Sequence, residues 1–306
     1  MNEIKERFIN AEGVDSFKRV SETHILDLYL GIDNMSRYTL FLIADIEPLR
    51  LFSSQLINVQ VGMRRDKRWG VSFSLINREF EDVFCHFCED IINSSQNLKT
   101  ADEGSDFVCT RYEKWQKMLS RYKGGILSES AIKGLIGELY FLLNYLIPIY
   151  GEEEAVNSWI GPEKANQDFV LGERWYEVKA TVAGAENIKI SSIEQLDTES
   201  DGELVIVYLD KTSYADDSKI TLNSIFIETL STLSGELIKQ KLTDILLNLG
   251  YYNRSEYDEH IFRFCKMERY KVDSTFPCIR RNLLSKAIIN SKYEMSVSFI
   301  SRYLEG

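Results

Sequence analysis

The most informative segment of this 306-residue chain reads Asp168-Phe169-Val170-Leu171-Gly172-Glu173-Arg174-Trp175-Tyr176-Glu177-Val178-Lys179. A two-residue turn at Gly172 and Glu173 suits the type II′ hairpin, whose first turn position favours glycine. Such a turn pairs Asp168 with Glu177, and directly opposed residues have Cβ atoms about 4.5–5.5 Å apart. The two-residue period of a strand puts Lys179 on the same face as Glu177. The segment therefore predicts two carboxylates and an amine on one face of a sheet.

The opposed charges of Asp168 and Glu177 would destabilise the sheet unless something compensated them. A divalent cation would do so, because Mg²⁺ is typically held by one or two carboxylates and keeps waters and substrate phosphates as its other ligands. A lysine beside the ion, here Lys179, could help lower the pKa of an attacking water or stabilise charge developing on phosphorus. These groups suffice for metal-assisted phosphodiester hydrolysis. The alternative interpretation is a surface hairpin with solvated charges.

A long amphipathic helix is predicted to begin after Ser128 or Ser130, with apolar residues at i, i+3, i+4 and i+7 spacing. Glu138 borders the apolar stripe of this helix, where a carboxylate without a partner would be costly. Gly134 and Gly137 leave space beside it, although each glycine costs a helix roughly 1 kcal/mol relative to alanine. A ligand or a closely packed strand would explain that space.

The chain is predicted to divide into a β-rich domain with one helix at 1–100 and a second domain with a C-terminal extension at 105–306. Residues 97–107 are polar and are interpreted as a linker. In the first part, strands are expected at 23–30, 38–44, 58–61 and 69–75, and a helix at 79–92. In the second part, strands are expected at 168–171, 175–181, 188–191, 204–209, 261–264 and 295–300, and helices at 112–121, 193–196, 237–249 and 282–289.

Composition excludes several classes of protein. The 36 basic and 47 acidic residues give a net charge of −11, which argues against a uniformly basic, histone-like protein but not against a nuclease with a local basic surface. A start without an apolar run, the absence of an uninterrupted apolar membrane segment and five sparse cysteines predict a reduced, soluble, cytoplasmic protein. Cys85 and Cys88 are expected to be packed thiols rather than half of a zinc site.

Charge is distributed unevenly along the chain. Residues 261–293 hold eight basic and two acidic residues, and short basic stretches occur at 64–68 and at 111–123, where aromatic residues are interleaved. These three stretches are candidate phosphate-contacting surfaces, with ordinary solvated faces as the alternative. Residues 194–217 carry eight acidic residues and one lysine, and are expected to face away from DNA or toward a protein partner.

The order of Glu138, Asp168, Glu177-Val178-Lys179 and Gln195 resembles that of the PD-(D/E)XK nuclease superfamily, which includes many restriction endonucleases. More narrowly, the chain resembles a bacterial family of PD-(D/E)XK members thought to accompany restriction-modification or phage-defence genes. Gln167 stands where many superfamily members have proline. The motifs that carry the narrower resemblance are Gly137-Glu138-Leu139, Trp159-Ile160-Gly161-Pro162, Gln167-Asp168-Phe169, Glu177-Val178-Lys179 and Ile190-Ser191-Ser192 with Gln195-Leu196.

The resemblance implies an α/β (α+β) fold: a restriction-endonuclease-like mixed β-sheet core flanked by helices, preceded by the β-rich N-terminal domain. It implies that Asp168 and Glu177 bind Mg²⁺ or Mn²⁺, with Glu138 as a further ligand directly or through water. Lys179 would be the catalytic lysine. Gln195 would orient the lysine or contact substrate.

The function expected from these residues is Mg²⁺-dependent DNA cleavage of restriction type in bacterial defence, with the N-terminal domain serving recognition or oligomerisation. A homodimer is one arrangement, because many double-strand cutters use two active sites. One alternative is a non-catalytic DNA-binding or assembly subunit for a partner ATPase or methyltransferase. Another is an RNase or repair nuclease of the same fold. No association with a membrane is expected.

Overall fold

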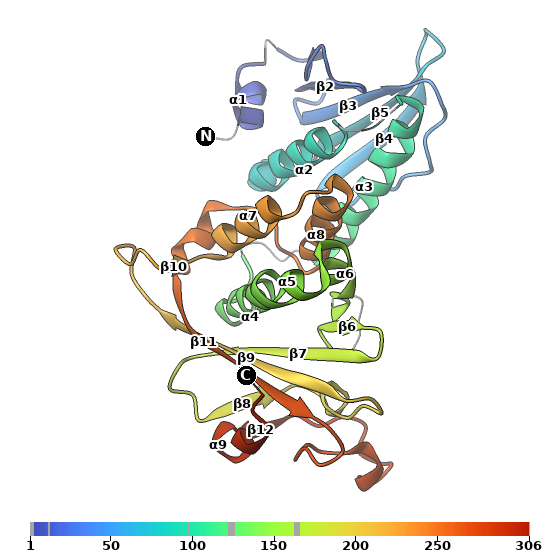
Figure 1. Ribbon diagram of the computed structural model, residues 1–306. Helices are drawn as coiled ribbons and strands as arrows, with labels where there is room; N and C mark the ends of the chain where they lie inside the picture. Colours follow the sequence, from blue (N-terminus) through green and yellow to red (C-terminus); the bar gives the residue numbers. More distant parts are fainter. Residues whose placement is uncertain are drawn as a thin grey trace. The chain divides into compact units, whose positions relative to one another are not determined.

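The computed structural model describes residues 3–11, 13–96, 98, 100–121, 126–161 and 166–305, without the side chains of residues 102 and 121. The chain forms two compact units, Met1–Gly124 and Gly125–Gly306. Each unit contains its own five-stranded sheet (Figure 1).

The first unit is built on an antiparallel sheet of strand order β1-β2-β3-β5-β4. Its elements are α1 (Glu3–Ile9), β1 (Ser16–Arg19), β2 (Asp27–Ile32), β3 (Tyr38–Ala44), β4 (Ile57–Met63), β5 (Trp69–Leu75), η1 (Arg78–Phe80), α2 (Glu81–Ser94) and α3 (Asp102–Arg121). Residues of alternate positions, such as Leu40, Leu42, Val71 and Phe73, are fully buried. The structure confirms the strands predicted at 38–44, from a continuous apolar run, and at 69–75, from alternation.

The helix α3 belongs to the first unit, so the division between the units falls at Gly124 and Gly125 rather than near residues 100–105. Arg111 of α3 is only 2% exposed and donates from Nε to Asp90 Oδ2 of α2 at 2.7 Å. The indole N–H of Trp115 donates to the same carboxylate oxygen at 2.7 Å. Part of the segment interpreted as a linker is therefore helix, held by a buried ion pair that sequence spacing does not reveal.

The second unit is built on a mixed sheet of order β10-β11-β9-β7-β6, in which β7 and β9 are parallel and the other neighbours antiparallel. The strands are β6 (Phe169–Leu171), β7 (Arg174–Thr181), β9 (Gly202–Lys211), β10 (Lys219–Ile220) and β11 (Phe262–Val272). The central strand β9 is buried on both faces, as the continuous apolar run at 204–209 predicted.

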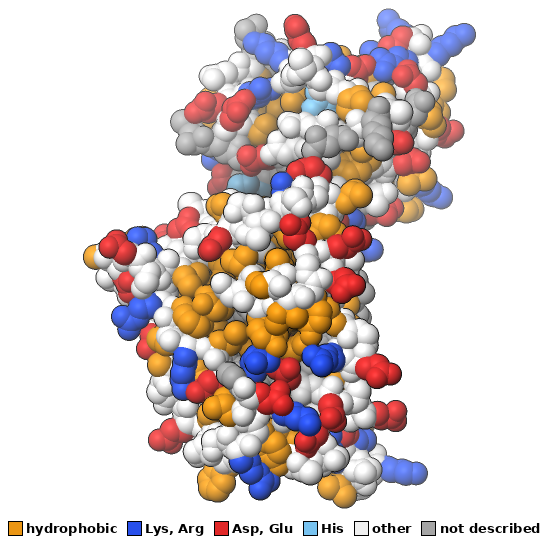
Figure 2. Space-filling model, viewed as in Figure 1, with side chains coloured by type: hydrophobic (Ala, Val, Ile, Leu, Met, Phe, Trp, Pro, Cys, Tyr) orange, Lys and Arg blue, Asp and Glu red, His pale blue; other side chains and the backbone are white. Residues whose placement is uncertain are grey.

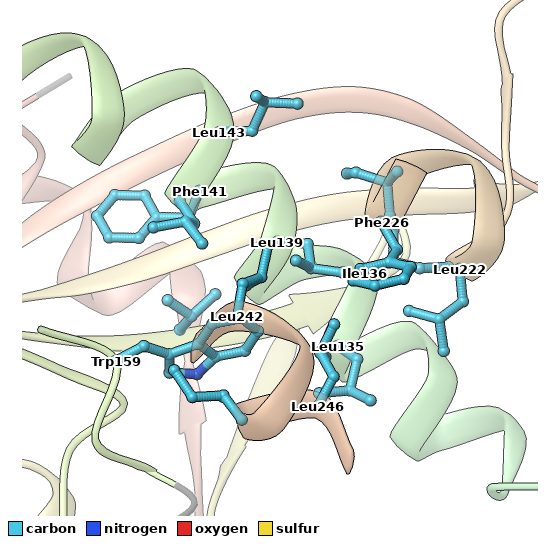
Figure 3. Packing of buried hydrophobic residues seen from close by; sticks show 14 of the residues in the cluster. Leu135, Ile136, Leu139, Phe141, Leu143, Trp159, Leu222, Phe226, Leu242 and Leu246 are labelled. Carbon is cyan, nitrogen blue, oxygen red and sulfur yellow. The ribbon is translucent and has the colours of Figure 1, made fainter. Parts of the chain in front are cut away.

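Helices cover one face of this sheet and enclose the larger hydrophobic core (Figure 3). They are α4 (Glu129–Phe141), a π-helical turn η2 (Leu142–Leu146), α5 (Ile147–Tyr150), α6 (Glu152–Ser158), α7 (Leu222–Thr232) and α8 (Glu236–Asn248). Ser128 caps α4 by accepting from Ala131 N. The continuous helix Glu129–Tyr150 is long and apolar enough to cross a membrane, but more than half of its most apolar part is buried within the protein. Most of its apolar residues belong to the hydrophobic core of the second unit.

The opposite face carries a second cluster around Trp175, Ile190 and Met295. It is covered by the two-stranded sheet of β8 (Asn187–Ile190) and β12 (Tyr293–Ser296), by the 3-10 turn η4 (Ile193–Gln195) and by α9 (Val297–Ile300). The remaining short turns are η5 (Ser255–Glu259), η6 (Arg281–Leu283) and η7 (Ser301–Tyr303). A mixed sheet flanked by helices confirms the expected fold class. The strand predicted at 295–300 ends at Ser296, and the helix predicted at 282–289 is only the turn η6.

Candidate active site

The hairpin that begins the site has the predicted register. Phe169 pairs with Tyr176, and Gly172 at the turn has a φ of +60°, which glycine adopts without strain. The ladder stops at Phe169, and on the side away from β7 the backbone oxygen of Asp168 accepts from Ile160 N at 3.0 Å. Beyond the ladder, the carboxylate oxygen Oδ2 of Asp168 accepts from Val178 N at 2.8 Å. Asp168 therefore lies at the open end of the hairpin.

Glu177 is the most buried charged residue of the site, with 1% of its area exposed. Its neighbours Tyr176 and Val178 belong to the helix-side core, so strand alternation places Glu177 and Lys179 on the opposite face. Lys179 Nζ donates to Glu177 Oε1 at 2.6 Å. The second oxygen, Glu177 Oε2, is buried and has no hydrogen-bond partner among the residues that the structure describes. An unsatisfied buried carboxylate oxygen is costly, which points to a ligand.

Gln195 is a second side chain that holds Lys179 in place. Its Oε1 accepts from Lys179 Nζ at 3.2 Å and from the backbone N–H of Ser191 at 2.8 Å. The side-chain amide of Gln167, a residue that sequence reasoning noted only as a replacement for proline, donates to the backbone oxygen of Glu194 at 2.7 Å. Gln195 thus has the lysine-orienting geometry that the family resemblance implied, on a 3-10 turn rather than a longer helix.

Glu138 approaches the hairpin from helix α4. A Cβ at the preceding Gly137 would lie 2.9 Å from the Cβ of Ala180, so glycine allows α4 to pack closely on β7. Glu138 Oε2 accepts from the indole N–H of Trp159 at 2.9 Å. A Cβ at Gly134 would meet no atom within 4 Å, so packing does not require glycine there. Trp159 was part of a recognised motif, but its role as a donor to Glu138 could not be derived from spacing.

Three carboxyl groups influence one another at this site. Burial, followed by the charge of Asp168, raises the pKa of Glu138 well above its usual value, and burial raises the pKa of Asp168. Burial and the charge of Asp168 raise the pKa of Glu177 to about 8, outweighing the opposing effect of Lys179. Three adjacent carboxylates are thus disfavoured unless a cation compensates them.

The donor set fits a hard divalent cation, because Mg²⁺ prefers carboxylate oxygens and Glu177 Oε2 is free to act as a ligand. Hydrogen bonds already hold Asp168 Oδ2, Glu177 Oε1 and Glu138 Oε2. Among the residues that the structure describes, no three His, Cys, Asp or Glu side chains are arranged as a finished metal site. Binding an ion would therefore require the carboxylates to reorient.

The raised pKa of Glu177 predicts how stability depends on pH. A carboxyl whose pKa rises on folding, here from 4.5 to about 8, binds a proton more tightly when folded, so the free energy of unfolding falls as pH rises through this window. We expect Glu177→Gln to reduce this fall, measured by urea unfolding in EDTA at about pH 5 and about pH 8. The control is Glu129→Gln, because Lys211 lowers the pKa of Glu129. An unchanged slope in Glu177→Gln would contradict the assignment.

The basic and acidic segments of the sequence largely neutralise each other within the second unit. Six of the eight basic residues at 261–293 form ion pairs, five of them with residues of the acidic segment 194–217. Most charges of these two segments therefore compensate one another, and the assignment of the segments to phosphate and to a protein partner stays a prediction. Figure 2 accordingly shows acidic and basic side chains intermixed on the visible face of this unit.

In the other two basic stretches, several charged or aromatic side chains are also paired or buried. Arg64 and Arg68 at the tip of the β4–β5 hairpin pair with Asp66 and with Asp27 and Asp45, respectively. In the stretch 111–123, Arg111, Tyr112 and Trp115 are buried, so they offer no surface to phosphate. Tyr122 and Lys123 lie outside the described residues.

The cysteine prediction is confirmed. Cys85 and Cys88 are buried in α2, and burial raises the pKa of Cys85 to about 12. Such thiols behave as core residues.

A mixed sheet flanked by helices, with an Asp, a Glu and a Lys at the open end of the β6–β7 hairpin, is the arrangement that the PD-(D/E)XK class of nuclease-like proteins leads one to expect. A family model described as "Putative PD-(D/E)XK family member, (DUF4420)" matches residues 6–298. The chain belongs to this family. No curated protein and no solved structure matches it.

Proposed function

We propose that the chain is a Mg²⁺-dependent (or Mn²⁺-dependent) DNA endonuclease that hydrolyses phosphodiester bonds. The observation that carries the proposal is the buried oxygen Glu177 Oε2, which has no partner in the described part of the chain and lies in a group of carboxylates with raised pKa values beside Lys179. Membership of a PD-(D/E)XK family supports the same chemistry.

In this proposal Asp168 and Glu177 hold the ion, with Glu138 as a third ligand directly or through water. The ion would polarise a phosphoryl oxygen and lower the pKa of a bound water. Lys179 is held between Glu177 and Gln195, so that its amine is positioned to stabilise charge developing on phosphorus. Trp159 fixes the orientation of Glu138 by donating to one of its oxygens.

The proposed setting is restriction-type cleavage in bacterial defence, in the cytoplasm. Its support is the resemblance of the motifs to a family thought to accompany restriction-modification or phage-defence genes. The first unit would recognise DNA or mediate assembly. The partners in this proposal are DNA, a second copy of the chain, and a methyltransferase or ATPase of the same defence system.

Calorimetric titration with Mn²⁺ tests the metal site separately from cleavage. We expect one site in the wild-type protein and at least tenfold weaker binding in Asp168→Asn, since the amide keeps the shape but loses the charge. The control is Asp201→Asn, because that side chain is 66% exposed and its nearest cation is 3.8 Å away. Unchanged binding in Asp168→Asn, or none in the wild type, would contradict the proposal and favour a non-catalytic binding module.

A further inference from the structure

The segment 281–292, here called the 281–292 loop, consists of η6 and the residues that lead from it to β12. Most of its apolar residues are exposed. Leu283 is 79% exposed, Ile289 is 86% exposed and Ile288 is 39% exposed. Exposed aliphatic side chains of this size gain nothing from folding of the chain itself. They therefore suggest contact with another molecule.

One end of the loop is fastened to the turn that carries Gln195. The guanidinium of Arg281 pairs with the carboxylate of Glu194 and donates to the backbone oxygens of Ile288 and Ile289 at 2.6 and 2.7 Å. The backbone N–H of Arg281 donates to Asp197 Oδ2 at 2.7 Å. Glu194 and Asp197 flank Gln195 in sequence, so one arginine ties both sides of the loop to the lysine-orienting turn.

The other end returns to the same place. Tyr293, the residue after the loop, pairs with Ile190 across β12 and β8. The next residue on that side, Ser191, donates its N–H to Gln195 Oε1. Both ends of the loop therefore adjoin the two segments that hold Gln195, and through it Lys179. The loop is therefore attached to the turn that positions Lys179.

The loop also carries the uncompensated positive charge of this region. Within the described part of the chain, Lys286 and Lys292 are exposed and form no ion pair, whereas the other six basic residues of 261–293 are paired. Free lysines beside exposed aliphatic side chains match duplex DNA, which offers phosphates to the lysines and base steps that apolar side chains can wedge apart.

We propose that the 281–292 loop binds duplex DNA beside the scissile phosphate, with Lys286 and Lys292 contacting phosphates and Leu283 and Ile289 inserting between base pairs. This inference rests on the proposed function, because it places the DNA by the site of Lys179. It adds the surface that holds the substrate and the part of the duplex that is deformed.

The phosphate contacts are tested by measuring DNA affinity against salt in EDTA, where cleavage is not needed for the readout. Each phosphate contact to B-DNA contributes about 0.9 to the slope of log K against log salt, so Lys286→Ala/Lys292→Ala should lower the slope by about 1.8. The wild type should then lose about 12-fold more affinity than the variant between about 50 and 200 mM salt. The matched control is Lys239→Ala/Lys241→Ala on α8, which should keep the wild-type slope.

The apolar insertion has its own readout, the fluorescence of 2-aminopurine placed in the duplex, which rises when its stacking is disrupted. We expect the wild type to raise this fluorescence and Leu283→Ala/Ile289→Ala to abolish the rise while keeping the salt slope. The control is Leu237→Ala, an equally exposed leucine of α8 at 83%. Circular dichroism verifies that the variants are folded.

These experiments distinguish a failure of the loop proposal from a failure of the proposed nuclease function. Salt-dependent binding by the wild type with the same slope in the lysine double variant would overturn the loop contact and leave the nuclease proposal standing. No fluorescence rise in the wild type, or a rise retained in Leu283→Ala/Ile289→Ala, would overturn the insertion. A wild type without affinity for DNA would overturn both the loop contact and the proposed DNA substrate.

Discussion

Lys179→Ala is expected to lower the single-turnover rate of Mg²⁺-dependent plasmid cleavage by about 10²–10³-fold. The amine is held in place by Glu177 Oε1 at 2.6 Å and Gln195 Oε1 at 3.2 Å, beside the carboxylates that would hold the ion. Removing it deletes a positive charge at the position where negative charge develops, while leaving the ligands themselves intact. Gel analysis of nicked and linear products over time provides the rate.

The control for this experiment is Lys239→Ala, a lysine of α8 whose amine pairs with Glu236. Lys179→Ala should also retain Mn²⁺ binding, because the substitution releases Glu177 Oε1 rather than removing a ligand. Retained metal binding with lost cleavage is the combination that a catalytic lysine predicts. Equal cleavage by wild type and Lys179→Ala would contradict the assigned site.

Asp90→Ala is expected to destabilise the first unit by about 3–5 kcal/mol. The carboxylate of Asp90 accepts from Nε of Arg111 at 2.7 Å and from the indole of Trp115 at 2.7 Å, and Arg111 is only 2% exposed. Truncating Asp90 leaves a buried guanidinium without its carboxylate. Urea unfolding followed by circular dichroism measures the change.

Asp66→Ala is the matched control, because Asp66 also pairs with an arginine, Arg64, but on the exposed tip of a hairpin. Its unfolding midpoint should stay close to that of the wild type, since exposed ion pairs contribute little. Wild-type stability of the Asp90→Ala variant would show that the buried ion pair does not hold α3 against α2 within the first unit.

The hairpin at the site could be predicted from sequence because local chemistry determines it. Gly172 supplies the positive φ of the turn, and the turn then sets the pairing of every residue back to Phe169. The helix after Ser128 and the central strand at 204–209 were predictable for the same reason, since each combines a strong apolar pattern with a clear boundary. Lys179 and Glu177 were correctly placed together because strand period alone relates them.

Other parts of the site depend on contacts between distant segments. The β6–β7 ladder ends before Asp168, so the side chain of Asp168 rather than a backbone oxygen of the hairpin accepts from Val178 N. The donation from Trp159 to Glu138 joins a loop to a helix, and no residue spacing encodes it. Only the motif in which Trp159 occurs signalled that this residue had a role.

The distribution of charge along the sequence was a poor guide to the distribution of charge on the folded protein. Strands β9 and β11 are antiparallel neighbours, and ion pairs such as Arg269 with Glu203 cross between them. A sum over either segment therefore counted charges that cancel in the fold. Lys286 and Lys292 emerge as uncompensated only after these pairs are known.

We propose above that Asp168 and Glu177 bind one divalent cation together. Anomalous diffraction from Mn²⁺-soaked crystals is the most direct test of this shared site. We expect an anomalous peak at coordination distance from one oxygen of Asp168 and one oxygen of Glu177, with Lys179 beside it. Ordered crystals with Mn²⁺ bound elsewhere, or with no peak between these two carboxylates, would contradict it.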